Sequence, residues 1–130
     1  MELIDTIKKD LKETLSERRY IHSIGVMEMC AKLAQIYGVD VQKAQIAGLL
    51  HDIAKEMPKE EMFKYVEENN IEITEIEKIS YQILHGKIGA DIAKKKYGLD
   101  EQIQNAIKSA TGSAMYTALA LSAVKTAGII

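Results

Sequence analysis

Apolar residues recur every three or four positions along most of the chain, and this spacing limits the fold more than any other feature. The clearest example is residues 2–15, where five apolar side chains share one predicted helix face: Leu3, Ile4, Ile7, Leu11 and Leu15. β-Branched residues occur singly and at helical spacing, not in the alternating runs of a strand. The sequence therefore predicts an all-α fold, a bundle of helices.

Capping residues divide the pattern into further helices. Ser16 is a favoured N-cap for a helix over 17–37, which Gly38 would end. The predicted buried stripe of this helix is Ile21, Ile24, Gly25, Met29, Leu33 and Ile36. Asp40 would begin a third helix that continues to residue 54, and its Ala and Gly content predicts tight packing at the centre of the bundle.

The later part of the chain shows the same signals. Pro58, placed at the first helical position, opens a predicted helix that ends near residues 69–70. A short helix is expected over 74–80, and two more over 86–97 and 101–108. Residues 109–130 differ in character, because they carry a single charge and a weak amphipathic pattern.

Length, charge and cysteine content limit the class of protein. The 130 residues suit a single domain over 1–130. A net charge of −2 gives no support to nucleic-acid or membrane-surface binding. Cys30 is the only cysteine, so no internal disulfide can form and a cytoplasmic location is expected. The acidic N-terminus is not a signal peptide, and no apolar run is long enough to span a membrane.

The stretch 47–55, AGLLHDIAK, places a histidine and an aspartate side by side after an apolar run. Burying such a pair is costly unless a partner satisfies it, and a divalent metal would satisfy both His51 and Asp52. Neighbouring side chains on a helix point about 100° apart, which suits a carboxylate that bridges two metals. The alternative is that His51 caps the helix or bonds to the core while Asp52 is exposed.

The three histidines of the chain, His22, His51 and His85, lie on three different predicted elements. Each alone could be a packed or capping residue. Together with Asp52 they make one economical metal site of imidazole and carboxylate ligands. The site has too few thiols for structural zinc and too few carboxylates for calcium or magnesium. Iron, manganese or another divalent transition metal fits better, and the spacing does not choose among them.

Basic residues beside the histidines suggest an anionic substrate. Lys55 follows His51 by four positions, so on a continuous helix both would rise on one side. Arg18 and Arg19 precede His22 by four and three positions. The alternative for Lys55 is an exposed lysine at a helix end. The alternative for Arg18 and Arg19 is that they lie in solvent at the start of a helix.

Three segments in order, RYIHS (19–23), LLHDIAK (49–55) and LHG (84–86), resemble the YqeK family of HD-domain hydrolases. The resemblance covers residues 1–108. It implies an HD-domain helical bundle with two metals, iron in the family, and symmetrical hydrolysis of diadenosine tetraphosphate to two ADP by a metal-activated water.

The resemblance also implies roles for individual residues. His22, His51 and Asp52 would hold the first metal, with Asp52 bridging, and His85 the second. Asp52 and Lys55 would take part in catalysis. The implied substrate contacts are Arg19, Lys55, Thr111 and Gly112.

The tail departs from the family pattern. A metal-binding histidine is expected where Ala110 stands, and residues 113–130 contain no Asp, Glu or His, so each implied metal lacks one ligand. Three interpretations stay open: a phosphohydrolase acting on a nucleotide, a degenerate non-catalytic module that binds metal or nucleotide, and a helical protein without metal. An apolar surface left uncovered would favour self-association, so a homodimer is also expected.

Overall fold

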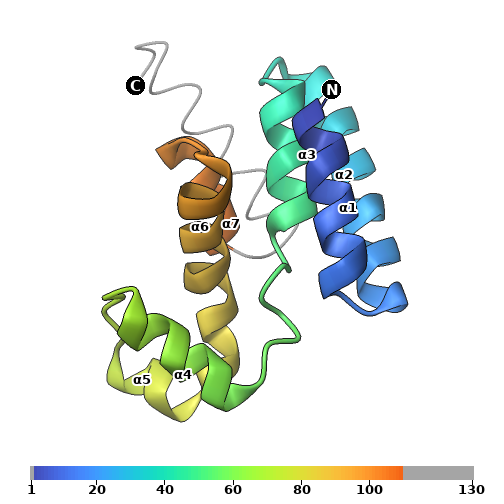
Figure 1. The fold of residues 1–130 in the computed structure, drawn as a ribbon. Helices are drawn as coiled ribbons and strands as arrows, with labels where there is room; N and C mark the ends of the chain where they lie inside the picture. The colour runs from blue at the N-terminus through green and yellow to red at the C-terminus, as the bar shows by residue number, and fades with distance from the viewer. Residues whose placement is uncertain (1, 110–130) are drawn as a thin grey trace, which may run out of the picture.

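The computed structural model describes residues 2–109, and over these residues it consists of helices joined by turns (Figure 1). The elements are α1 (Glu2–Thr14), α2 (Glu17–Tyr37), α3 (Val41–Leu50), α4 (Lys59–Glu68), α5 (Glu75–Ile79), the 3₁₀ helix η1 (Tyr81–Ile83), α6 (Leu84–Tyr97) and α7 (Glu101–Ser109). The predicted all-α fold is confirmed. The divergent tail, apart from Ser109, lies outside the described residues. None of the helices between residues 2 and 109 is both long and apolar enough to cross a membrane.

The helix ends follow the predicted caps. The side chain of Ser16 accepts a hydrogen bond from the backbone N–H of Arg19, which fixes the start of α2. Gly38 ends α2 with a φ of 73°, in the left-handed region that favours glycine. Asp40 caps α3 in the same way as Ser16 caps α2, by accepting from the N–H of Lys43. Pro58 is the N-cap of α4, not its first helical residue as predicted.

Helices α2 and α3 form the closest packed pair of the bundle, because their contact faces carry small residues. The buried residues of α2 are Ser23, Met27, Cys30 and Ala34. Gly48 of α3 faces them so closely that an added Cβ would lie 3.0 Å from Met27 Cα and 3.3 Å from Cys30 Sγ. The predicted central position of α3 and its tight packing are confirmed: every residue from Ile46 to Leu50 is buried.

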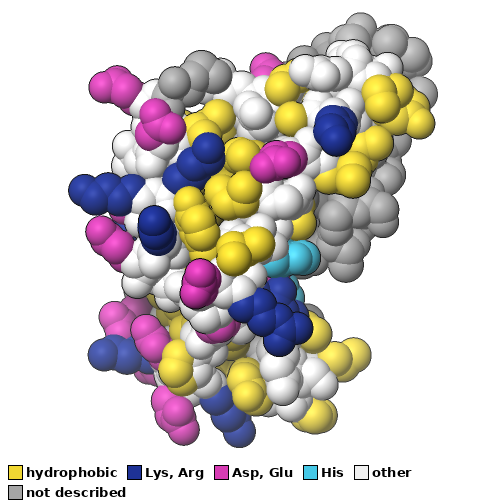
Figure 2. All heavy atoms as spheres, turned by 90° about the vertical axis from the view of Figure 1, so that its right-hand side faces the viewer, with side chains coloured by type: hydrophobic (Ala, Val, Ile, Leu, Met, Phe, Trp, Pro, Cys, Tyr) yellow, Lys and Arg dark blue, Asp and Glu magenta, His cyan; other side chains and the backbone are white. Residues whose placement is uncertain are grey.

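The predicted buried stripe of α2 is wrong in large part, although Ile24 is half-buried against the core. Ile21, Met29 and Ile36 are 61%, 56% and 72% exposed. The two helices approach at Gly48 of α3 and the face of α2 that carries Ser23, Met27, Cys30 and Ala34, and this turns Ile21, Met29 and Ile36 outward. Apolar side chains are visible at the surface on the side of the molecule where α1 and α2 lie (Figure 2).

Helix α3 ends at Leu50, four residues earlier than predicted. From there the backbone makes three-residue turns: Ile53 N–H donates to Leu50 O at 3.1 Å, and Lys55 N–H donates to Asp52 O at 2.9 Å. His51 and Asp52 therefore lie in a tight turn, not on a regular helix.

The described residues form two hydrophobic clusters. The main cluster contains buried residues of α1, α2, α3, α7 and the second half of α6. The second cluster contains Ala54, Met62, Val66, Leu84 and Ile88, and joins α4 to the first half of α6. Figure 1 shows α4 and α5 set apart from α1–α3, with α6 reaching both regions. The turn that holds His51 and Asp52 lies at the boundary between the clusters.

Candidate metal centre

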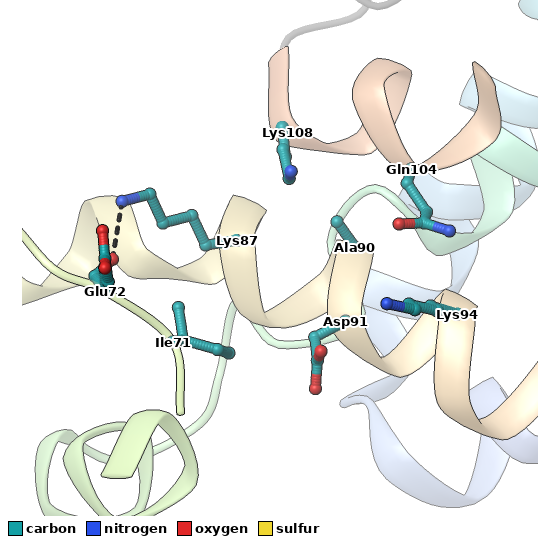
Figure 3. Close-up of a pocket in the computed structure, with 8 residues that line it drawn as sticks. All are labelled: Ile71, Glu72, Lys87, Ala90, Asp91, Lys94, Gln104 and Lys108. Atoms are coloured by element: carbon teal, nitrogen blue, oxygen red, sulfur yellow. Dashed lines mark hydrogen bonds between the residues drawn. The ribbon is translucent and has the colours of Figure 1, made fainter. Parts of the chain in front are cut away.

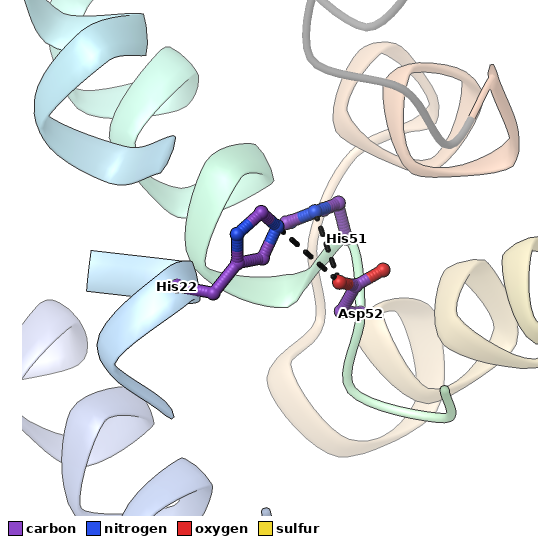
Figure 4. Close-up of side chains that lie close together, drawn as sticks. All are labelled: His22, His51 and Asp52. Atoms are coloured by element: carbon purple, nitrogen blue, oxygen red, sulfur yellow. Dashed lines mark ion pairs between the residues drawn. The ribbon is translucent and has the colours of Figure 1, made fainter. Parts of the chain in front are cut away.

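Two histidines converge on one carboxylate oxygen (Figure 4). His22 Nε2 of α2 lies 3.6 Å from Asp52 Oδ2, and His51 Nε2 lies 3.3 Å from the same atom. The three ligand atoms lie within 4.8 Å of one another, close enough to surround one metal ion. The structure therefore brings together His22, His51 and Asp52, as the sequence predicted.

The backbone fixes the orientation of His51. Its Nδ1 lies 2.7 Å from the carbonyl oxygen of Gly48 and donates to it in the neutral ring. A ring that donates from Nδ1 presents an unprotonated Nε2, which is the form that binds a metal. His85 is held in the same way, with Nδ1 2.7 Å from the carbonyl oxygen of Gln82.

His85 approaches the carboxylate from its other side. Its Nε2 lies 3.9 Å from Asp52 Oδ1, whereas His22 and His51 face Oδ2. Two imidazoles at one oxygen and one at the other is the arrangement of a carboxylate that bridges two metals. The contribution of His85 to a second metal stays a prediction.

Asp52 is held as a carboxylate although it is only 4% exposed. Burial raises its pKa, but the hydrogen bond and charge that His51 supplies when its ring is protonated in the absence of metal, together with the charges of Arg19 and of a protonated His85, outweigh burial, so the pKa lies below its usual value. Arg19 donates from its guanidinium to Asp52 Oδ2 at 3.0 Å. The guanidinium thus occupies the oxygen that faces the two histidines.

The contact between Arg19 and Asp52 was not predicted, because Arg19 was expected only to flank an anionic substrate. The signal was present in the spacing, since Arg19 precedes His22 by three positions and shares its helix face. Arg18, Arg19 and His22 line an open cavity of about 260 Å³. A substrate anion in this cavity would meet both guanidinium groups beside the histidines.

The sequence predicted that Lys55 lies beside His51 on one side of a continuous helix. This prediction is wrong, because α3 ends at Leu50. The side chain of Lys55 is exposed, and among residues 2–108 no contact joins its ammonium to the three-residue cluster. A substrate could still reach Lys55, so its role stays a prediction. Thr111 and Gly112, predicted to contact substrate, lie outside the described residues.

The donor set fits a divalent transition metal. Two imidazole nitrogens and a carboxylate oxygen are borderline ligands that suit such ions, and no thiolate takes part. The backbone hydrogen bond of His51 supplies the outer support that metal-binding histidines normally have.

Comparisons with known proteins agree with this geometry. Residues 19–127 match the family model described as HD domain. The chain is 36% identical over 99 residues to a symmetrical bis(5'-nucleosyl)-tetraphosphatase of Bacillus subtilis, covering 75% of this chain and 53% of that protein. It is 38% identical over 106 residues to the Staphylococcus aureus protein of the same name, covering 81% and 54%.

A solved structure is also similar. It is described as a predicted HD superfamily hydrolase involved in NAD metabolism from Clostridium acetobutylicum, and it is 37% identical with a TM-score of 0.80. The match covers 88% of this chain and 66% of that one. The chain spans about half the length of the curated relatives it matches. The predicted resemblance to HD-domain hydrolases is confirmed.

Proposed function

The chain belongs to the HD domain family, and on that premise we propose that it is a metal-dependent phosphohydrolase that cleaves diadenosine tetraphosphate symmetrically into two ADP. The proposed partner is therefore a nucleotide substrate. The proposed metal is iron, the proposed location is the cytoplasm, and a homodimer is the proposed assembly.

One observation carries the proposal: both oxygens of Asp52 face imidazole nitrogens. His22 and His51 face Oδ2, and His85 faces Oδ1. An aspartate with a purely structural role needs one or two hydrogen-bond donors, not three imidazoles from separate elements. Relatives named as tetraphosphatases then supply the substrate class.

The residues of the chain would divide the work as follows. His22, His51 and Asp52 would hold one metal, and His85 and Asp52 a second. When bound, a divalent metal lowers the pKa of a water and withdraws charge from a phosphoryl group. Gly48 keeps the His51 ring in its metal-binding form through the hydrogen bond to Nδ1.

Arg19 would change partner during binding. In the described structure its guanidinium pairs with Asp52 Oδ2, the same oxygen that the two histidines face. A metal at that oxygen would displace the guanidinium toward the cavity lined by Arg18, Arg19 and His22. There both arginines would bind phosphate oxygens of the substrate.

Metal analysis of the purified protein, combined with chromatography of the products formed from diadenosine tetraphosphate, tests the proposal. Bound metal together with ADP as the only nucleotide product supports it. Bound metal without turnover would support the non-catalytic module that binds metal or nucleotide. Absence of metal after loading with Fe²⁺, Mn²⁺ or Co²⁺ contradicts both.

Matched variants separate the metal centre from general damage. Asp52→Asn should abolish metal binding and turnover, because the amide loses the charge at the centre. Asp10→Asn makes the same chemical change at a carboxylate near the surface that accepts from Tyr97, and it should leave both properties intact. Equal effects of the two substitutions would contradict the assignment of Asp52.

A further inference from the structure

A second cavity lies between α6, α7 and the segment before α5 (Figure 3). It has a volume of about 320 Å³, at the lower end of the range for small-molecule sites. Lys87, Asp91 and Lys94 line it from α6, and Gln104 and Lys108 from α7. Ala90 lies at its base, and Ile71 and Glu72 close one side.

The cavity opens on the side of α6 that faces away from the metal centre. Gly89 faces Ile107 of α7 and the turn that holds Asp52, since a Cβ there would lie 3.2 Å from Ile107 Cγ2, 3.5 Å from Ile53 Cγ2 and 3.7 Å from Leu50 O. Lys87 and Asp91 are each two positions from Gly89, so they point roughly the opposite way. The two sites are therefore separate.

The charged groups of the cavity differ in whether they have partners. Lys87 donates to Glu77 at 2.8 Å and to the carbonyl oxygen of Glu72 at 3.0 Å. Asp91 accepts from Tyr65 at 2.8 Å and pairs with Lys95 at 3.1 Å. These two groups are neutralised locally and leave little charge for a ligand.

Lys94 and Lys108 differ from these two groups within the described part of the chain. Among residues 2–108 neither ammonium makes an ion pair or a hydrogen bond with another side chain. In Figure 3 they extend into the cavity from α6 and α7. The carboxylate of Asp91 is already paired with Lys95, so an anion near Lys94 and Lys108 would meet positive charge.

Acceptors lie at both ends of the cavity: Gln104 stands one turn before Lys108 on α7, and Glu72 stands at the other end beside Lys87. Gln104 donates from its amide to the carbonyl oxygen of Leu99 at 3.0 Å, which leaves its own oxygen free to accept. Glu72 uses its backbone carbonyl toward Lys87, and its carboxylate lines the cavity. A ligand that suits this lining has a phosphate near Lys94 and Lys108 and hydroxyl donors that reach Gln104 and, at the other end, Glu72.

We propose that this cavity binds a small phosphorylated ligand that carries hydroxyl groups, a sugar phosphate or a nucleoside monophosphate. Lys94 and Lys108 bind the phosphate, and Glu72 and Gln104 accept hydrogen bonds from the hydroxyl groups. The site lies between α6 and α7, and it is independent of the proposed hydrolysis.

Calorimetric titration of the metal-stripped protein with ribose 5-phosphate, AMP and inorganic phosphate tests the proposal. We expect the two hydroxyl-bearing probes to bind more tightly than inorganic phosphate. The double variant K94Q/K108Q should weaken binding at least about tenfold, because two charge-assisted hydrogen bonds are lost. Both side chains are exposed, so the variant should fold normally.

The matched control is K12Q/K32Q, which removes two exposed lysines elsewhere and should change affinity less than twofold. Amide shifts in NMR spectra give the position of the ligand, expected around Ala90 and Gln104. Equal weakening in both double variants, or shifts centred on Arg19 and His22, would overturn the proposal. Tighter binding of inorganic phosphate than of both other probes would overturn the assigned class, as would no binding of any probe.

Discussion

Gly48→Ala and Gly25→Ala are the same substitution in two helices, and the structure predicts opposite effects on stability. In α3, a Cβ at Gly48 would lie 3.0 Å from Met27 Cα and 3.2 Å from Met27 N. Both contact atoms are backbone, so they cannot move without shifting α2. In α2, a Cβ at Gly25 would meet nothing within 4 Å.

The magnitudes follow from two opposing effects. Replacing glycine by alanine inside a helix contributes about 1 kcal/mol of stability. At Gly25 this is the only effect, so the free energy of unfolding should rise by about 0.5–1 kcal/mol. At Gly48 overpacking costs about 1–3 kcal/mol and outweighs the helix preference. The two variants should therefore differ by about 1–3 kcal/mol.

Urea unfolding of the metal-stripped protein, followed by circular dichroism, measures this difference. The midpoint should fall for Gly48→Ala and rise for Gly25→Ala, with little change in the dependence on urea concentration. Metal affinity provides a second measurement. Because the displaced α3 carries His51 away from His22, Gly48→Ala should also weaken metal binding.

Equal free energies of unfolding for Gly48→Ala and Gly25→Ala would contradict the predicted clash between α2 and α3. That result would mean that α2 and α3 can separate without cost, so their close packing would not position the histidines. A destabilised Gly48→Ala with unchanged metal affinity would refute only the second step.

Three further substitutions give distinct outcomes. Arg19→Ala should tighten metal binding up to about fivefold, because it removes a guanidinium that competes for Asp52 with about 0.2–1 kcal/mol. Turnover should fall in the same variant. Weaker metal binding in a competition titration would contradict this prediction. Burial raises the pKa of Glu77, but the hydrogen bond and charge of Lys87 outweigh burial and lower it. The ionised carboxylate therefore stabilises the folded protein fully above the usual pKa of Glu. This contribution disappears as the pH falls through the lowered pKa. Glu77→Gln should therefore lose less stability than the parent protein when thermal unfolding is compared at pH 5 and pH 3. Thr74→Ala should cost about 1 kcal/mol in urea unfolding, because it removes the N-cap of α5, and an unchanged midpoint would show that this helix is held by packing alone.

Local signals explain how much of the fold could be predicted from the sequence. Ser16, Gly38 and Asp40 act on backbone groups next to them, so the ends of α2 and the start of α3 could be placed without the tertiary structure. The grouping of His22 and His51 in one site was predicted from their ligand chemistry and strengthened by the family resemblance, because spacing alone does not bring separate helices together.

The exposed stripe of α2 could not be predicted, because helical periodicity allows either face to be buried. Ile21, Met29 and Ile36 are the more hydrophobic choice, but the buried face is decided by the shape of the partner helix. Gly48 of α3 admits the α2 backbone at Met27, and this approach buries the α2 face that carries Met27 and Cys30. The place of Lys55 was missed because α3 ends at Leu50, where the sequence carries no capping glycine to mark a helix end.

Because Asp52 lies at the boundary between the two hydrophobic clusters, its carboxylate can connect them. His51 follows the apolar residues of the main cluster, whereas His85 lies beside Leu84 of the second. Only the 3.9 Å gap between Asp52 Oδ1 and His85 Nε2 separates them at this point. A metal ion bound by ligands from both clusters would link them. The two clusters would then unfold together with the ion bound, and one after the other once it is removed.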